Sequence, residues 1–277
     1  MSLSDFTTEH PVEVSLSEVE SIRFGYQIGR CTVPMMSPAN PIDVALEIRS
    51  SDAEITVLRY PADRVNWFDL LARQLVDHVL LHADTLAYWE LSVGSANPPE
   101  ALENISTGYA TDAAMTGDLA TRIFAEYSNH YSANPLLSTE AVAAGYREWA
   151  MRTPLPDSLI LFMNGSPIGM ATIETTPDQI EILLAGVIPE QRSRGLYQHI
   201  LRAIESRAEE DSVSRVVIST QSHNTVVQRA WARYGFLPLA TILTVHVVRA
   251  DIWGAAPTSS GSRIDHITDA AAERRHS

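Results

Sequence analysis

The residues best suited to chemistry in this chain lie in a turn between a predicted strand and a predicted helix. The apolar run that ends at Val187-Ile188-Pro189 predicts a strand, and the turn Glu190–Gly195 leads into an amphipathic helix. The free N–H groups of a first helical turn, with the positive end of the helix dipole, form an anion site. Arg192 and Arg194 add forked donors suited to phosphate oxygens, and Gly195 lets the backbone approach a ligand closely. The segment predicts a pyrophosphate cradle, with a solvated turn as the alternative.

Charge and composition limit the classes of partner. The 277 residues carry a formal net charge of -14, from 34 acidic and 20 basic residues. Nucleic acids and anionic membranes require a basic footprint, so neither is expected, whereas a small anionic ligand between two arginines is compatible. No signal peptide or membrane-length apolar run is present, which predicts a soluble, cytoplasmic protein. Cys31 is the single cysteine, which excludes an internal disulfide and a cysteine-rich metal site; we expect a buried or half-buried thiol, with a nucleophile as the alternative.

The elements that must position the turn follow a loop-rich break at Gly94–Glu100, which contains a Pro-Pro pair. Hydrophobic periodicity after this break predicts alternating strands and helices. The Asn164-Gly165 dipeptide predicts a tight hairpin turn. The predicted strands are 106–110, 158–163, 168–175, 179–188, 215–220 and 239–248. A first predicted helix is capped by Asp112 or Thr116, and three further helices are predicted over 139–151, 195–209 and 225–234.

The N-terminal part predicts a smaller β-β-α-β unit, with strands at 45–48, 54–60 and 85–93 and a helix over about 66–82. From Ile252 the composition predicts a disordered tail. We therefore expect a small domain over 1–93, a linker over 94–105, a larger domain over 106–251 and a tail over 252–277. The small domain shapes a substrate site, forms a homodimer interface or only supports the fold, and the sequence leaves these alternatives open.

The run Arg192-Ser193-Arg194-Gly195-Leu196-Tyr197 resembles the Arg/Gln-x-x-Gly-x-Gly/Ala signature by which GNAT acetyltransferases hold the pyrophosphate of coenzyme A (CoA). The resemblance includes the Val-x-Pro-Glu segment before it. It also includes Asn224, followed eleven residues later by Gly235-Phe236, and it extends over about 106–249. Tyr197 departs from the signature, which has a small residue at that position.

This resemblance implies an α/β (α+β) GNAT fold, a mixed and mostly antiparallel sheet with flanking helices. It implies acetyl-CoA as cosubstrate, bound without a metal. The strands 179–188 and 215–220 would separate to hold the pantetheine arm, with the Val187 N–H as oxyanion donor. Asn224 would contact the pantetheine, unless it only caps the following helix. Trp231 would lie beside the cofactor.

The catalytic candidates are a glutamate and a tyrosine. Glu181 is the charged residue of an apolar strand, placed by strand parity on the face of Leu183 and Ala185, and is the first candidate for the base that deprotonates the amine. Glu174 is the weaker alternative. The family commonly protonates the leaving thiolate with a Tyr seven residues after the Asn. That position is Trp231 here, so Tyr234, one helical turn further, is the candidate acid, with a core position as its alternative.

The acceptor would meet the loop Asn129–Leu136, where His130, Tyr131 and Asn134 supply hydrogen-bonding and stacking groups. This loop resembles that of TDP-fucosamine N-acetyltransferases and their relatives. A polar helix-to-helix loop is the alternative, and His246 is expected to be an ordinary strand histidine. The resulting hypothesis is direct acetyl transfer to the amine of a nucleotide-linked deoxyamino sugar. Another small amine, another acyl-CoA, or an inactive CoA-binding module remain alternatives.

Overall fold

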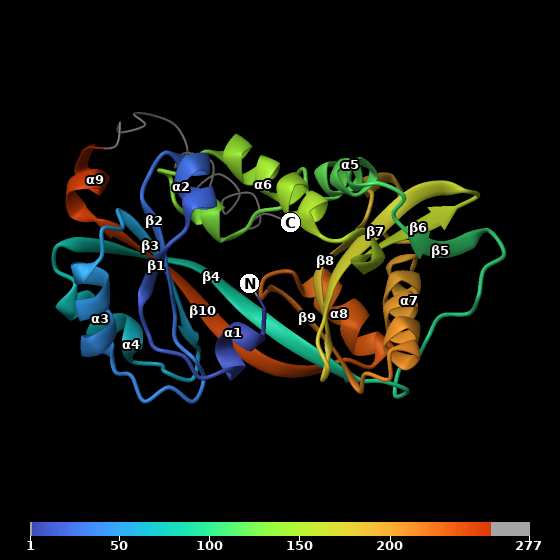
Figure 1. The fold of residues 1–277 in the computed structure, drawn as a ribbon, viewed down its shortest axis with the longest axis horizontal. Coiled ribbons are helices and arrows are strands. Elements are labelled where there is room, and N and C mark those ends of the chain that lie inside the picture. Colours follow the sequence, from blue (N-terminus) through green and yellow to red (C-terminus); the bar gives the residue numbers. More distant parts are fainter. Residues whose placement is uncertain (1, 256–277) are drawn as a thin grey trace, which may run out of the picture.

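Ten strands form one continuous sheet in the computed structural model, which describes residues 2–255 (Figure 1). Their spatial order is β1-β2-β3-β10-β4-β9-β8-β7-β6-β5, and most neighbours are antiparallel. The strand bounds are β1 Val14–Leu16, β2 Ile28–Thr32, β3 Ile55–Pro61, β4 His78–Ser92, β5 Ile105–Tyr109, β6 Ser158–Met163, β7 Ser166–Thr175, β8 Ile180–Val187, β9 Arg215–Gln221 and β10 Leu237–Arg249. The predicted fold class is confirmed.

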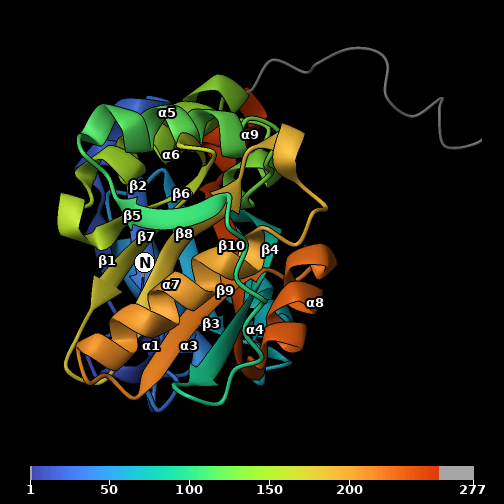
Figure 2. The same cartoon turned by 90° about the vertical axis from the view of Figure 1, so that its right-hand side faces the viewer.

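Helices cover both faces of this sheet, and α5 and α6 lie side by side in Figures 1 and 2. Helix α2 joins the same layer, where Arg23 forms an ion pair with Glu148 of α6 at 2.6 Å. The helix bounds are α1 Ser4–Thr7, α2 Glu18–Phe24, α3 Pro41–Ser50, α4 Trp67–Gln74, α5 Ala113–Ile123, α6 Thr139–Arg152, α7 Tyr197–Glu210, α8 Thr225–Tyr234 and α9 Ala250–Ala255, with short 3-10 turns η1 His130–Ala133, η2 Leu155–Asp157 and η3 Pro189–Gln191.

The two longest strands join the N-terminal and C-terminal parts of the chain. β10 lies between β3 and β4 and is antiparallel to both. β4 in turn pairs with β9 of the C-terminal part, from Leu86 opposite Gln221 to Ser92 opposite Arg215. The sheet is therefore shared across the predicted division between 1–93 and 106–251, and that division stays a prediction.

The C-terminal half follows the sequence pattern closely. Asp112 caps α5 by accepting a hydrogen bond from the Met115 N–H at 2.8 Å. Asn164 and Gly165 have φ of 51° and 76°. Positive φ at both central residues is the conformation of a tight hairpin turn, which joins β6 to β7 as predicted.

The N-terminal β-β-α-β prediction was wrong in two places. Residues 45–48 lie in helix α3 because the Asn40 side chain accepts hydrogen bonds from the N–H groups of Ile42 and Asp43, and Pro41 occupies the first turn. The helix predicted over 66–82 ends at Gln74, and strand β4 begins at His78. The predicted tail also needs correction: 252–255 belong to α9, and 256–277 lie outside the described residues.

Strands β8 and β9 separate after a short paired stretch. They pair in parallel only where Ile180–Ile182 of β8 lie opposite Val216–Ile218 of β9. On the other edge of β8, Ile182 and Leu184 face consecutive residues of β7, so Leu183 is the extra residue of a β-bulge, which bends a strand locally. The predicted gap between these strands is confirmed.

Gly186 allows the end of α5 to pack against this gap. A Cβ built on Gly186 would overlap Cγ2 of Ile123. Gly186→Ala should therefore lower the free energy of unfolding by about 1–3 kcal/mol, measured by urea denaturation. Combining it with Ile123→Ala should cost less than the sum of the two single changes. Gly108→Ala is the matched control, because its Cβ would meet only Phe162, at 3.6 Å; an equal loss there would contradict the packing argument.

Candidate active site

A continuous cavity of about 880 Å³ runs from the predicted pyrophosphate turn to the N-terminal part of the sheet. Its donor end is lined by Arg192, Ser193 and Gly195, and its middle by residues of the β8–β9 gap. Its far end is lined by side chains of α2, β2, β3 and the loop after α5, namely Glu20, Arg23, Arg30, Arg59, His130 and Tyr131. One cavity therefore connects the predicted donor and acceptor sites.

The turn before α7 presents a row of free backbone donors. Ser193 and Gly195 have φ of 63° and 76°. Among the described residues, the N–H groups of Ser193–Tyr197 donate to no other group. Left-handed residues in such a turn point successive N–H groups into a concavity that binds anions, and the helix dipole adds to the effect.

The two arginines of the turn have different positions. Arg192 donates from Nη2 to the Ile123 carbonyl at 2.7 Å and from Nε to the Val187 carbonyl at 3.3 Å. It therefore ties the turn to the ends of α5 and β8 while lining the cavity. Arg194 is exposed and does not line the cavity.

Val187 presents its backbone N–H to the gap. The Ile188 N–H donates to Ile168 of β7 at 2.9 Å. Because backbone groups alternate between the two edges of a strand, the Val187 N–H faces the β9 side, where pairing has ended. The donor geometry predicted for Val187 is thus available in the gap.

Asn224 does not cap helix α8. It occupies the N-cap position, but its side chain accepts no hydrogen bond from the helix. Its Nδ2 donates to Thr220 Oγ1 at 3.1 Å, and the residue lines the cavity. The capping alternative is therefore excluded.

Trp231 and Tyr197, the two departures from the family pattern, are in contact. Trp231 Nε1 donates to the Tyr197 hydroxyl at 3.1 Å, and both residues line the cavity. Burial raises the pKa of Tyr197. A phenolic hydroxyl therefore lies beside Trp231, supplied by α7 instead of α8. Leu196, the remaining residue of the turn, is buried in the core and touches the cavity.

Tyr234 lies in the core, outside the cavity lining. It is fully buried, and its hydroxyl donates to Glu205 Oε2 at 2.8 Å. Burial, followed by the Glu205 carboxylate, raises its pKa. This position favours the alternative of a core aromatic over a general acid.

Glu181 is directed away from the cavity. It is 2% exposed, and it accepts hydrogen bonds from Ser2 Oγ at 2.6 Å and from the Leu3 N–H at 2.8 Å. Burial raises its pKa. The bulge at Leu183 breaks the alternation on which its predicted face depended. The geometry supports an anchoring contact for the N-terminal segment, and a catalytic role stays a prediction without support here. Glu174, the weaker candidate, pairs in register with Glu181 and is also outside the lining.

The acceptor loop forms a buried histidine pair. His130 Nδ1 contacts Nε2 of His246 at 2.9 Å, and Asn134 Nδ2 contacts Nδ1 of His246 at 3.3 Å. His246 is thus a network member, not the ordinary strand histidine expected. Tyr131 packs against His130 in the lining, with ring centroids 3.8 Å apart and the ring planes tilted by 40°, whereas Asn134 is buried and outside the lining.

Sequence reasoning missed Arg59, which joins this network from β3. Its Nη2 contacts His130 Nε2 at 2.9 Å, and its Nε donates to Thr244 Oγ1 at 3.2 Å. Burial, followed by the charge of Arg30, lowers the pKa of Arg59 to about 10. No local motif marks this residue, since its partners lie 71 and 185 residues away.

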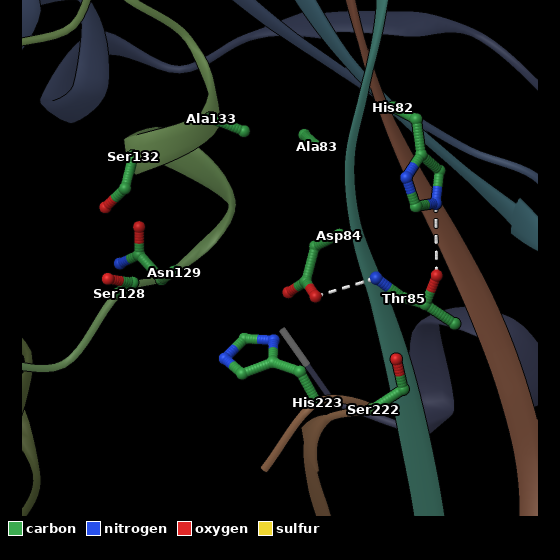
Figure 3. Close-up of a pocket in the computed structure, with 10 residues that line it drawn as sticks. All are labelled: His82, Ala83, Asp84, Thr85, Ser128, Asn129, Ser132, Ala133, Ser222 and His223. Atoms are coloured by element: carbon green, nitrogen blue, oxygen red, sulfur yellow. Dashed lines mark hydrogen bonds between the residues drawn. The ribbon is translucent and has the colours of Figure 1, made fainter. Parts of the chain in front are cut away.

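A smaller hollow of about 450 Å³ adjoins the same loop. Figure 3 shows the Asp84 carboxylate there, bonded to the Thr85 N–H, with the imidazole of His223 nearby. Its second oxygen is buried without a hydrogen bond within the described chain, and burial raises the pKa of Asp84. No local motif marks this residue either.

Comparison with known proteins gives one family match and several structures of similar fold. Residues 120–236 match the model of the acetyltransferase (GNAT) family. The match includes the turn before α7 and the β8–β9 gap, and it supports acetyl transfer from acetyl-CoA to an amine as the activity proposed below. No curated protein matches the sequence.

Several solved structures share the fold at low sequence identity. A GCN5-related N-acetyltransferase from Kribbella flavida has a TM-score of 0.57 at 15% identity, covering 88% of this chain and 90% of that one. A tandem GNAT protein of the clavulanic acid biosynthesis pathway has a TM-score of 0.54 at 12% identity, covering 84% and 77%. A glucosamine N-acetyltransferase region of a fungal multi-domain β-N-acetylglucosaminidase has a TM-score of 0.56 at 13% identity, covering 85% and 31%.

No helix within 2–255 is long and apolar enough to cross a membrane. In the same part of the chain, no group of three or more His, Cys, Asp or Glu side chains is arranged to hold a metal ion.

The buried histidines predict a pH-dependent stability. Burial, followed by the charge of Arg59, holds the pKa of His130 well below its usual range and lowers that of His246 to about 3. Between that value and the unfolded pKa of about 6.5, the folded state binds fewer protons than the unfolded chain. Stability is therefore lost as pH falls below about 6.5, by at most about 1.4 kcal/mol per pH unit for each histidine.

Urea denaturation of wild type and His246→Gln across this pH range tests the prediction. The stability difference between them should shrink as pH falls, because only wild type must keep the buried imidazole neutral. His82→Gln, at an exposed histidine, is the control. A difference that is independent of pH would contradict a neutral His246.

Proposed function

We propose that the cavity binds acetyl-CoA and a small amine together, and that the acceptor is a nucleotide-linked deoxyamino sugar. The observation that carries this proposal is the continuity of the cavity from the free N–H groups at Ser193–Tyr197 to the acceptor loop at His130. Both substrates can then meet in the β8–β9 gap, so transfer is direct and needs no covalent enzyme intermediate.

The donor is proposed to bind with its pyrophosphate on the turn before α7. Arg192 and the N–H groups of Ser193, Gly195 and Tyr197 hold the phosphates. The pantetheine arm follows the β8–β9 gap, within reach of the Asn224 amide. The thioester carbonyl then accepts from the Val187 N–H, which stabilises the oxyanion formed when the amine attacks.

Tyr197 is proposed to protonate the departing thiolate. When the tetrahedral intermediate collapses, the C–S bond breaks and the sulfur receives a proton from the Tyr197 hydroxyl, which lies in the cavity beside Trp231. The attacking amine nitrogen loses a proton as the amide forms, and the hydroxyl recovers a proton through solvent. A thiol of pKa about 8.5 is a tolerable leaving group, so the contribution of this acid should lie at the low end of the range for general acids, about 10²-fold.

The acceptor class is supported by the polar and aromatic lining of the far end. Tyr131 offers a stacking surface and His130 a hydrogen-bonding group at the cavity wall. Such groups suit a sugar or a base. One fold relative is named as a glucosamine N-acetyltransferase region, which agrees with an amino sugar as acceptor.

Release of CoA thiol from acetyl-CoA, measured across a panel of amines, tests the proposed function. Turnover with a TDP- or UDP-linked amino sugar, and none with polyamines or amino acids, is the expected result. Turnover with a different small amine would keep the enzyme class and replace the acceptor. No release of CoA thiol with any amine, together with calorimetric binding of acetyl-CoA, would favour a CoA-binding module. Absence of acetyl-CoA binding would reject the proposed function.

Tyr197→Phe should lower kcat by about 10²-fold and leave the KM for acetyl-CoA nearly unchanged, because it removes only the proton donor. Tyr234→Phe is the matched control: it should lower stability by about 1 kcal/mol through loss of the Glu205 hydrogen bond and keep kcat. The reverse pattern, measured by steady-state kinetics and thermal unfolding, would assign the acid to Tyr234.

The two roles considered for Glu181 are separated by comparing Glu181→Gln with Ser2→Ala. If Glu181 anchors the N-terminal segment, both changes should lower the unfolding temperature, and kcat should fall little and to a similar extent. Loss of kcat by about 10²-fold or more in Glu181→Gln alone would restore it as the base.

A further inference from the structure

The far end of the cavity holds a buried cation without an ion-pair partner. Arg59 is 6% exposed, and its hydrogen bonds go to the neutral groups Thr244 and His130. No carboxylate of the described residues lies within ion-pair distance of its guanidinium. Burying an unpaired charge is costly, so such a group is retained where it binds a ligand of opposite charge.

Its surroundings do not supply the missing negative charge. Three arginines line this end, Arg23, Arg30 and Arg59. Arg23 is paired with Glu148 of α6 and Arg30 with Glu20, each at 2.6 Å, so neither carboxylate is left to compensate Arg59. One unpaired positive charge therefore remains here, in a chain whose net charge is -14. It makes this end attractive to an anion and unfavourable for a polyamine.

The hydrogen-bond chain behind Arg59 also lacks an acceptor. Asn134 Oδ1 accepts from the Leu136 N–H at 3.1 Å, so its Nδ2 is the group that faces His246. Arg59 and Asn134 are therefore donors at opposite ends of the His130–His246 pair. The three contacts of this chain need three acceptors, but two neutral imidazoles provide only two lone pairs.

An anion at Arg59 would complete this chain. Asn134 would donate to His246, His246 to His130, and His130 Nε2–H would then point, with the Arg59 guanidinium, at the bound oxygen atoms. Every donor would have an acceptor, and the buried charge would have a counter-ion. The position already lines the cavity from both Arg59 and His130.

We propose that Arg59 and His130, with Arg30 at the rim, form a subsite for an oxyanion of the acceptor, a phosphate or a carboxylate. This inference rests on the proposed function in that the same cavity holds the amine. The acceptor is then a molecule with its amine in the β8–β9 gap and an anionic group at the opposite end. A sugar linked to a phosphate or diphosphate has this arrangement, whereas a neutral free amino sugar lacks the anion.

The direct test is calorimetric titration of the protein already saturated with CoA, so that the donor anion site is filled. Inorganic pyrophosphate and succinate are the two probes. At least one should bind, and Arg59→Met should weaken it by about 10- to 100-fold while leaving CoA affinity unchanged, since a charge-assisted hydrogen bond is lost. Tighter binding of pyrophosphate identifies phosphate chemistry, and tighter binding of succinate identifies a carboxylate.

Two variants accompany this titration. Arg30→Met should weaken the same probe by a smaller factor, because Arg30 is already paired with Glu20. Arg49→Met removes an equal charge from an exposed site paired with Asp77 and should not change binding. Arg59→Met should also unfold at a higher temperature than wild type, because a buried unpaired charge is replaced by an apolar chain of similar length.

Several results would overturn the subsite. Failure of both probes to bind the CoA-saturated protein would do so, as would equal binding by wild type and Arg59→Met. Absence of CoA binding would instead reject the proposed function. Anion binding lost in Arg59→Met, without turnover of any amine in the panel, would uphold the subsite and reject the catalytic proposal.

Discussion

The separation of β8 and β9 after three paired residues is the constraint on which the site depends. It leaves the Val187 N–H without a strand partner at a buried position, and a buried donor without an acceptor is costly. The α7 turn lies at the open end of the gap, where Arg192 fixes it to Val187 and to the end of α5. The opening is thus fixed by contacts of the fold itself, and its free donors suit the proposed ligand, which carries amides and phosphates.

The continuous sheet explains what the N-terminal part contributes. Because β10 lies between β3 and β4, two strands, β10 and β4, separate β3 from β9. Side chains from β2, β3 and α2 then form the far wall of a cavity whose near wall is formed by β8, β9, α8 and the turn before α7. Of the three roles considered for 1–93, shaping the acceptor site is the one that this arrangement supports.

Local patterns predicted the C-terminal half because its turns and caps are short-range. Asn164-Gly165 and Asp112 act through neighbours within a few residues, and the turn before α7 takes its shape from positive φ at Ser193 and Gly195. Residues 45–48 were misassigned because a capping Asn40 decided between helix and strand. The face of Glu181 depended on a bulge that no alternation pattern reveals. Arg59 and His246 were missed because their contacts with His130 connect residues 71 and 116 positions apart.

The two departures from the family signature are best understood as one change. A large residue at position 197 would crowd the phosphates if its ring turned toward the preceding loop. Instead it packs against α8, where its hydroxyl accepts from Trp231, 34 residues further along the chain. The Ser193–Tyr197 N–H groups stay free, and the phenol that lies beside Trp231 comes from Tyr197 of α7. Since each aromatic occupies space that the other leaves, reverting one alone should disturb the site more than reverting both.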